Sequence, residues 1–221
     1  MSKVTYKDIR DSEAVNAYIQ QGNETLGALG YTDHSSAHAV IVAVQSGKIL
    51  QKLEYGKRDI ELAKIAGYMH DIGNCVNREN HAQSGALLAH GILRDMGMNY
   101  GEIAVVMNAI GHHDETDGCA VNPVSAALIL ADKTDVRRNR VRNRIKESFD
   151  KHDRVNYAVT ASRLDILLPK KTILFDIDLD EEICSMMDYF EIFIQRMVMC
   201  KRAAEVLGLK FKMVANKNKI C

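Results

Sequence analysis

The chain contains 221 residues, of which 47% are apolar, and its 29 basic residues equal its 29 acidic residues in number. This apolar share supports a sizeable core and excludes a globally disordered chain, while a formal net charge of zero gives no indication of a nucleic-acid or membrane partner. No run approaches the roughly 20 apolar residues that a membrane span requires, and the presence of only two prolines favours helices.

The beginning of the chain and its cysteines indicate where the protein works. Residues 1–13 are polar and lack the apolar core of a signal peptide. The cysteines form an odd set without a Cys-x-x-Cys pair: Cys75, Cys119, Cys184, Cys200 and Cys221. We interpret them as reduced thiols. These features together predict a cytoplasmic protein.

Apolar residues recur at helical spacing through the first two thirds of the chain. The stripes are Leu62, Ile65, Ala66, Met69; then Ala86, Ala89, Leu93, Met96; then Ile103, Val106, Met107, Ile110; and then Val124, Ala127, Leu128, Ala131. Each stripe predicts a helix with one buried face. Gly73 is expected to end the first of these helices. Asn122 followed by Pro123 predicts the start of the last one, as an N-cap and a first-turn proline.

The C-terminal third breaks the helical pattern twice. Residues 173–179 and 210–215 alternate between apolar and polar side chains, which indicates strands. Between them, residues 180–207 predict the longest helix, which Gly208 would end. Its expected buried face consists of Ile183, Met187, Phe190, Ile194 and Met197. We therefore predict a mainly α fold with a small C-terminal two-stranded β element. The expected parts are a helical domain over residues 1–150 and a strand–helix–strand appendage over residues 151–221, packed on the same domain.

Histidines and aspartates gather at the ends of the predicted helices. They are His34, His38, His70, Asp71, His81, His112, His113 and Asp132. A single histidine or one His-Asp pair is weak support for a metal site, but this ordered set is not. Neutral imidazoles and carboxylates from several elements suit a divalent metal. Asp71 and Asp132 end apolar stripes, where an unpaired charge would be costly.

The ordered string resembles the HD superfamily of metal-dependent phosphohydrolases over residues 34–140. The resemblance is carried by His38, by Met-His-Asp-Ile-Gly around His70 and Asp71, and by Leu-Ala-Asp ending at Asp132. It implies an all-helical HD domain in which these four residues hold one divalent metal ion.

Relatives with two metals extend the implied ligand set. They carry further histidines at places that His81 and the pair His112-His113 match, with Asp71 as the bridge between the ions. We favour two ions over one, and either or both members of the pair remain candidate ligands. Mn, Fe, Ni, Co and Zn are not distinguished by such a set. His34 is a weaker candidate, outside the ligand set or facing the substrate.

Two features depart from close relatives. Many relatives have His-Asp-Ile-Gly-Lys, but this chain has Asn74 in place of that lysine, which removes one candidate phosphate contact. The segment beginning at His112 is similar to the HD-GYP cyclic-dinucleotide phosphodiesterases. Cys119, Ala120 and Val121 follow it instead of Gly-Tyr-Pro, which argues against cyclic di-GMP. The C-terminal third matches no motif of the family.

Residues 133–146 provide candidate cations for the substrate, with seven basic residues against one acidic residue. Lys133 and Arg137 lie one and five residues after Asp132, so a continuing helix would turn both toward the site, where they would neutralise phosphoryl oxygens and assist catalysis. We interpret Arg140, Arg142 and Arg144 as a solvated basic face. No aromatic residues are interleaved here for stacking on bases, so nucleic acid is not an expected partner.

The leading functional hypothesis is hydrolysis of a phosphomonoester or phosphodiester, nucleotide-like and small, by a metal-activated water. One alternative is an HD-fold di-iron oxygenase resembling myo-inositol oxygenase, which iron content and oxygen uptake would reveal. Another is a non-catalytic, metal-bound sensor or interaction module whose methionine-rich long helix forms a homodimer face. The leaving-group acid is not determined; His34 and the non-ligating member of the pair His112-His113 are candidates.

Overall fold

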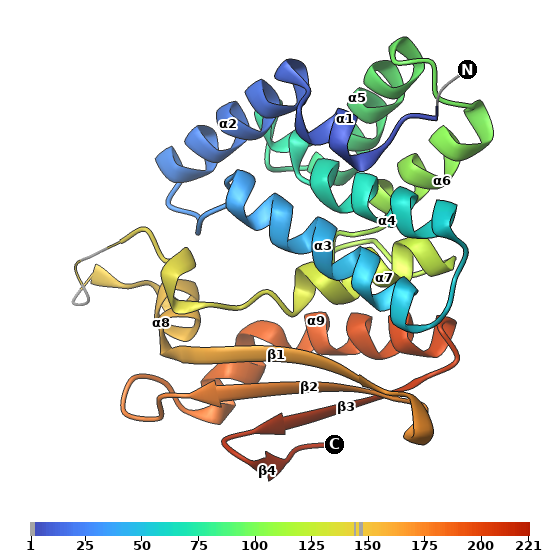
Figure 1. Cartoon of the computed structure of the whole chain (residues 1–221). Coiled ribbons are helices and arrows are strands. Elements are labelled where there is room, and N and C mark those ends of the chain that lie inside the picture. Colours follow the sequence, from blue (N-terminus) through green and yellow to red (C-terminus); the bar gives the residue numbers. More distant parts are fainter. Residues whose placement is uncertain (1–2, 144, 146–147) are drawn as a thin grey trace.

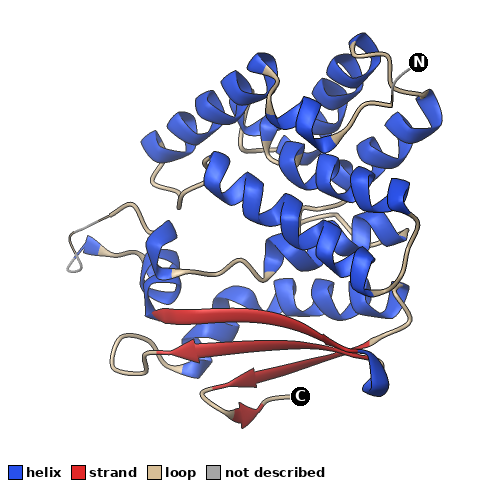
Figure 2. Ribbon diagram, viewed as in Figure 1, coloured by secondary structure: helices blue, strands red, loops and turns tan. Residues whose placement is uncertain are grey.

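Residues 3–143, 145 and 148–221 are described by the computed structural model, so Arg144 lies outside the described residues. Figure 2 shows that helices form most of the molecule and that one small sheet lies near the C-terminus. The helices are α1 Tyr6–Arg10, α2 Glu13–Ala28, α3 Ser36–Lys52, α4 Lys57–Met69, α5 His81–Asp95, α6 Tyr100–Gly111, α7 Pro123–Lys133, α8 Lys151–Ala158 and α9 Met186–Val206, with 3-10 turns η1 Ile72–Cys75, η2 Arg138–Arg140 and η4 Leu168–Lys170. The strands are β1 Val159–Leu167, β2 Thr172–Leu179, β3 Lys210–Ala215 and β4 Asn218–Lys219. The mainly α prediction is confirmed.

Helix α7 is the centre of the helical part. Its residues from Val124 to Ala131 are all buried, and it packs against α3, α4, α6 and α9. The predicted start is confirmed: the Asn122 side chain accepts a hydrogen bond from the Ser125 backbone N–H, and Pro123 occupies the first turn. Because α7 is enclosed on every side, polar groups at its C-terminal end face the interior rather than solvent.

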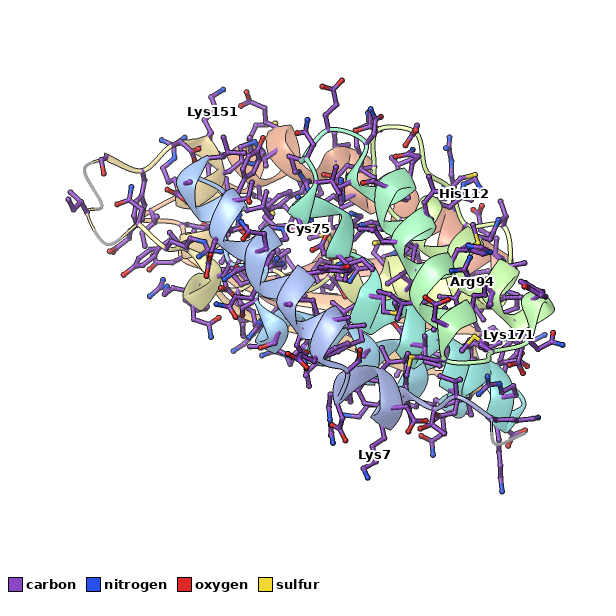
Figure 3. The ribbon with its side chains drawn as sticks, turned by 90° about the horizontal axis from the view of Figure 1, so that it is seen from above. Lys7, Cys75, Arg94, His112, Lys151 and Lys171 are labelled. Atoms are coloured by element: carbon purple, nitrogen blue, oxygen red, sulfur yellow. The ribbon has the colours of Figure 1, made fainter. Side chains whose placement is uncertain are left out.

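Two helix pairs surround α7. Helices α3 and α4 are in extensive contact, and α5 packs on α6 (Figure 1). Gly67 allows the first of these contacts, since a Cβ atom there would lie 2.7 Å from the Ala43 Cα. Seen from above in Figure 3, the turn η1 with Cys75 lies beside α2, and the two are in contact. These contacts bring the end of α4 under α2 and α5.

The predicted end of the first striped helix is wrong. Helix α4 stops at Met69, four residues before Gly73, and Gly73 lies inside η1 without a positive φ. Its role is close approach: a Cβ atom at Gly73 would lie 1.9 Å from the His81 carbonyl oxygen. This glycine therefore lets the start of α5 pack directly onto the turn after His70.

Gly73→Ala is expected to destabilise the protein by at least about 1–3 kcal/mol, because backbone atoms of α5 would have to move. The matched control is Gly91→Ala inside α5, where a Cβ atom meets nothing within 4 Å. Removing the glycine's entropy cost there should stabilise the protein by roughly 0.5–1 kcal/mol. Urea unfolding with a chelator present measures both variants. Equal midpoints for Gly73→Ala and wild type would contradict the close-approach role.

The C-terminal sheet has four strands in the order β1-β2-β3-β4, and not the two that we predicted. The expected strands are present and pair in parallel through β2 and β3, with α9 as the connection between them. The missed strand β1 is antiparallel to β2 at the sheet edge. Polar side chains on β1, including Arg163 and Asp165, conceal any simple alternation of apolar residues. Figure 1 shows α9 between α7 and the sheet.

Helix α9 starts later than predicted and buries a different face. Ser185 caps its N-terminus, and Gly208, with φ +72°, follows its end as expected. Met187 and Ile194, assigned to the core from the sequence, are 77% and 46% exposed. The buried face is Tyr189, Phe193, Met197, Cys200, Ala203 and Ala204. Apolar residues occur on two faces of this helix, so spacing alone did not identify the one that packs on α7.

None of the helices that the structure describes combines the length and the hydropathy of a membrane span. The five cysteines are all free thiols, as interpreted from their spacing.

Candidate metal centre

Three helices, α3, α4 and α7, bring four of the predicted ligands to one point. His38 lies in the first turn of α3, His70 and Asp71 follow the end of α4, and Asp132 lies near the end of α7. His38 Nε2 lies 3.3 Å from Asp132 Oδ1, and His70 Nε2 lies 3.2 Å from Asp71 Oδ2 and 3.6 Å from Asp132 Oδ1. These four side chains therefore converge on a single cluster of nitrogen and oxygen atoms.

A second cluster adjoins the first through Asp71. The Oδ1 atom of Asp71 lies 3.5 Å from His81 Nε2 and 3.7 Å from His113 Nε2. The two imidazole nitrogens are 3.2 Å apart. The Oδ2 atom of Asp71 faces the first cluster, so one carboxylate presents one oxygen to each group.

Five histidine rings at the site all carry a proton on Nδ1. In each ring Nδ1 lies within hydrogen-bonding distance of an oxygen that can only accept: Thr32 O for His34 at 2.7 Å, Asp135 Oδ2 for His38 at 2.7 Å, Gly67 O for His70 at 2.8 Å, Arg78 O for His81 at 3.1 Å, and Ile110 O for His113 at 2.6 Å. Each Nδ1 must therefore carry a proton and donate it. This arrangement directs the Nε2 atoms toward the site and is the usual way in which proteins orient metal-binding histidines.

The donor set fits divalent metal ions. His38 Nε2 and His70 Nε2 are buried without a hydrogen-bond partner among the described residues. His81 Nε2 and His113 Nε2 face each other as two lone pairs, because both rings donate through Nδ1. A cation between such atoms would satisfy them, and metal–ligand bonds of about 2.0–2.2 Å separate neighbouring ligand atoms by about 3.0–3.5 Å. The separations in both clusters lie close to that range.

The electrostatics of the cluster also favour a cation. Burial disfavours charge on His70, but Asp71 and Asp132 outweigh it and raise the pKa of His70 to about 10. Burial likewise opposes ionisation of both carboxyls, yet His70 holds the pKa of Asp71 well below its usual range, and Lys133 does the same for Asp132. At His81, burial and a neighbouring imidazole lower the pKa to about 4. Two ionised carboxylates are thus buried where a metal ion can take the place of the His70 proton.

The structure distinguishes the two members of the adjacent histidine pair. His113 is buried and belongs to the second cluster, whereas His112 is not in either cluster and its Nδ1 lies 4.0 Å from Cys119 Sγ. The structure therefore does not bring His112 together with the other predicted ligands. His34 precedes α3 and does not lie on it, yet its Nε2 is 4.0 Å from Asp71 Oδ2. It faces the site from the edge.

The predicted substrate cations have different surroundings from those expected. Lys133 Nζ lies 2.9 Å from Asp132 Oδ2 and 3.5 Å from Glu115 Oε2, so its charge holds the ligand carboxylate in place. Arg137 does not line the cavity beside the metal centre; its guanidinium donates to Asp135, with Nη2 3.0 Å from Oδ2. The helix ends at Lys133, and the chain turns before Arg137, which is why a continuing helix gave the wrong direction.

Arg140, interpreted from the sequence as part of a solvated face, is instead buried beside the metal centre. Its Nε donates to Asp33 O at 3.0 Å and its Nη1 to Asp135 O at 2.8 Å. Its Nη2 makes no hydrogen bond within the described part of the chain. Arg140 lines a cavity of about 400 Å³ together with His34, Asp71 and Lys133. The sequence missed this cation because the 3-10 turn η2, and not a helix, directs it inward.

Further residues of the site were not among the candidates predicted from the sequence. Asn74, the replacement for the family lysine, donates to Asp71 Oδ1 at 2.9 Å and so orients the Asp71 carboxylate. Asp114 Oδ2 lies 3.6 Å from His81 Nε2, and Arg78 Nη1 lies 3.3 Å from the same nitrogen. Arg196 reaches the cavity from α9, 64 residues after Asp132. Asn74, within the family motif, and Asp114, directly after the histidine pair, could have been suspected from their positions.

Asp135→Ala is expected to lower metal affinity by about 10–100-fold, because the acceptor that orients His38 is lost. Asp135→Asn retains an acceptor oxygen and should lose less. Competition with a chromophoric chelator measures both affinities. Asp165→Ala on β1, an exposed position, is the control and should bind metal as wild type does. Wild-type affinity in Asp135→Ala would show that Asp135 does not position His38.

Comparisons with known proteins agree with this geometry. Residues 36–154 match the family model for the HD domain. Over 176 residues the chain is 31% identical to an uncharacterized protein of Methanocaldococcus jannaschii, an alignment that covers 68% of this chain and 66% of that protein. It is 30% identical over 141 residues to ribonuclease Y of Aliarcobacter butzleri and 32% identical over 116 residues to ribonuclease Y of Enterococcus faecalis. These two alignments cover 62% and 51% of this chain, but the chain spans only 25% and 20% of the two ribonucleases.

Proposed function

The chain belongs to the HD domain family, and from this premise we propose that it is a metal-dependent phosphohydrolase that cleaves a phosphomonoester or phosphodiester of a small, nucleotide-like substrate. One observation carries the proposal: the two oxygens of Asp71 face two adjoining imidazole groups at the wall of a cavity that cations also line. Carboxylate bridges of this kind are typical of two-metal hydrolytic sites.

We propose a dinuclear centre. His38, His70 and Asp132 would hold one ion, His81 and His113 the other, and Asp71 both. Bound ions would polarise the phosphoryl group of the substrate and lower the pKa of a bound water to about 7. The surrounding residues keep the ligands ready: the Nδ1 hydrogen bonds fix each imidazole, and Lys133 and Asn74 hold the two carboxylates.

The residues around the cavity support binding of a phosphoryl group. Arg140 is held by two backbone carbonyls, which leaves Nη2 free to donate to a phosphoryl oxygen without reorganisation. Burial lowers the pKa of His34 well below its usual value, so its ring is neutral and suited to accept a proton at Nε2. His112 does not line the cavity, which removes it as a candidate for the leaving-group acid.

The size of the cavity supports a small substrate. Its volume of about 400 Å³ falls within the roughly 300–1,000 Å³ of small-molecule sites. A long nucleic acid would meet only the mouth of such a cavity, although a single terminal nucleotide would fit. We further propose that the protein acts in the cytoplasm, on the grounds of its five free thiols.

The test is a panel of substrates presented to protein loaded in turn with Mn, Fe, Ni, Co and Zn. The panel contains nucleoside mono-, di- and triphosphates, cyclic dinucleotides, simple phosphoesters and a short RNA. Release of phosphate or nucleotide by the loaded protein, absent after chelation, is the expected result. Iron-dependent oxygen uptake without hydrolysis would favour an oxygenase. Bound metal with no turnover of any kind would favour a sensor.

A further inference from the structure

Arg196 on α9 is an anchored arginine with unused donors. Its Nε donates to both carboxylate oxygens of Glu115, at 3.0 and 3.1 Å. Its guanidinium carbon lies 4.4 Å from the centre of the Phe193 ring, a stacking contact that fixes the plane of the group. Neither Nη atom has a hydrogen-bond partner among residues 3–143, 145 and 148–221. An arginine that served only to pair with Glu115 would be expected to donate two parallel N–H···O hydrogen bonds from two of its nitrogens.

The free side of Arg196 belongs to the cavity beside the metal centre. Arg196 and Glu115 line it together with Lys133 and Arg140. Glu115 is shared, because Lys133 Nζ lies 3.5 Å from its Oε2 while Arg196 binds both of its oxygens. One carboxylate thus contacts two cations, and Asp132 pairs with Lys133 as well. Glu115 and Asp132 match the charges of Lys133 and Arg196, so this wall offers an anion unused guanidinium N–H donors rather than a surplus of positive charge.

Arg140 and Arg196 line the same cavity, although they come from different parts of the chain. Burial lowers the pKa of Arg140, and the like charge of Arg196 acts in the same direction. No described carboxylate is bonded to both of them. An anion between or beside them would stabilise both charges, since phosphate accepts charge-assisted hydrogen bonds from guanidinium groups.

The two arginines are not equivalent with respect to the metal centre. Arg140 lines the cavity together with Asp71 and Asp132 and is held there by two backbone carbonyls, so it suits the phosphoryl group that reacts. Among the described residues, Arg196 pairs with Glu115, Glu115 also pairs with Lys133, and Lys133 pairs with Asp132, so Arg196 lies one group further out. An anionic group linked to the reacting phosphoryl would arrive at this second position.

We propose that Arg196 is a specificity-determining residue that binds a second anionic group adjoining the reacting phosphoryl, so that the preferred substrates carry at least two linked phosphates. This inference rests on the proposed function and narrows its substrate class to nucleoside diphosphates, triphosphates or other diphosphate esters. The residue comes from outside the segment that matches the HD domain. The C-terminal part of the chain would then select the substrate while the HD domain carries the metal.

Two inert probes that differ by one anionic group test the proposal without turnover. Methylphosphonate and methylenediphosphonate are titrated calorimetrically into the full-length, metal-loaded protein after removal of free metal, with metal content measured before and after. The variants are Arg196→Gln, Arg196→Lys and the control Arg202→Gln, which removes an exposed arginine from the same helix. Melting temperatures establish that each variant is folded.

Wild type and Arg202→Gln are expected to prefer methylenediphosphonate by at least about 10-fold, the scale of one charge-assisted contact. Arg196→Gln should lose that preference and keep its affinity for methylphosphonate, and Arg196→Lys should lose part of it. A preference that persists in Arg196→Gln, a wild-type protein without any preference, or an equal loss for both probes would overturn the proposal. Because binding is measured, selective loss in a protein that hydrolyses nothing would refute the proposed function and leave the anion site standing.

Discussion

Asp71→Ala is expected to release metal and to lower hydrolysis by more than about 10³-fold. The two oxygens of Asp71 face the two imidazole groups, so its removal takes a ligand atom from each. The loss should therefore exceed the roughly 10²–10³-fold cost of deleting a single electrostatic donor. Metal content by mass spectrometry and turnover on the best substrate of the panel measure the two effects together.

Two further variants separate the carboxylate charge from the space that it fills. Asp71→Asn keeps the volume and one acceptor oxygen but places an amide toward one imidazole group, so it should retain less than the full metal complement. Asp95→Ala, at a position 69% exposed at the end of α5, should leave metal and turnover unchanged. Full turnover by Asp71→Ala would refute the assignment of the catalytic centre.

His113→Ala and His112→Ala are expected to differ sharply although the residues are adjacent. His113 points its Nε2 at Asp71 Oδ1 and at His81. Its removal should lower the affinity for one ion by at least about 10²-fold, which is more than the loss of a residue that only orients a ligand would cause. His112 contacts neither cluster, and its removal should leave both ions in place. Metal-to-protein ratios during titration with a chelator measure this.

The metal-to-protein ratio also gives the number of ions that each protein molecule binds. Loss of one ion of two in His113→Ala, with the other retained by His38, His70 and Asp132, would support the dinuclear proposal. Loss of the only ion in that variant would show a single centre shared by both imidazole groups. Equal metal loss in His112→Ala would contradict the placement of the pair.

The C-terminal part of the chain has a direct relation to the centre. Helix α9 packs on α7, the helix that carries Asp132 and Lys133, and it supplies Arg196 to the cavity. The sheet supports α9 from the other side through β3. A region without a family motif thus forms one wall of the site that the family motif builds.

The sequence by itself determined the fold class, the family and the kinds of metal ligand. Helical stripes report one buried face per helix, so local spacing is enough to find most helices. His70-Asp71 and Asp132 were identifiable because ionisable residues at the ends of apolar stripes need a compensating charge. These are properties of short segments, and they depend little on how the segments are later arranged.

Only the tertiary structure decided which side chains act together. His112 and His113 are adjacent, so the sequence around them does not distinguish them. The direction of each ring depends on how α6 ends against its neighbours. Arg140 turned from an apparent surface residue into a buried cation because the chain leaves the helix after Lys133 and two distant carbonyls bind its guanidinium. Arg196 reached the site only through packing of α9 on α7. Contacts between segments far apart in the chain set all three, and no local pattern records such contacts.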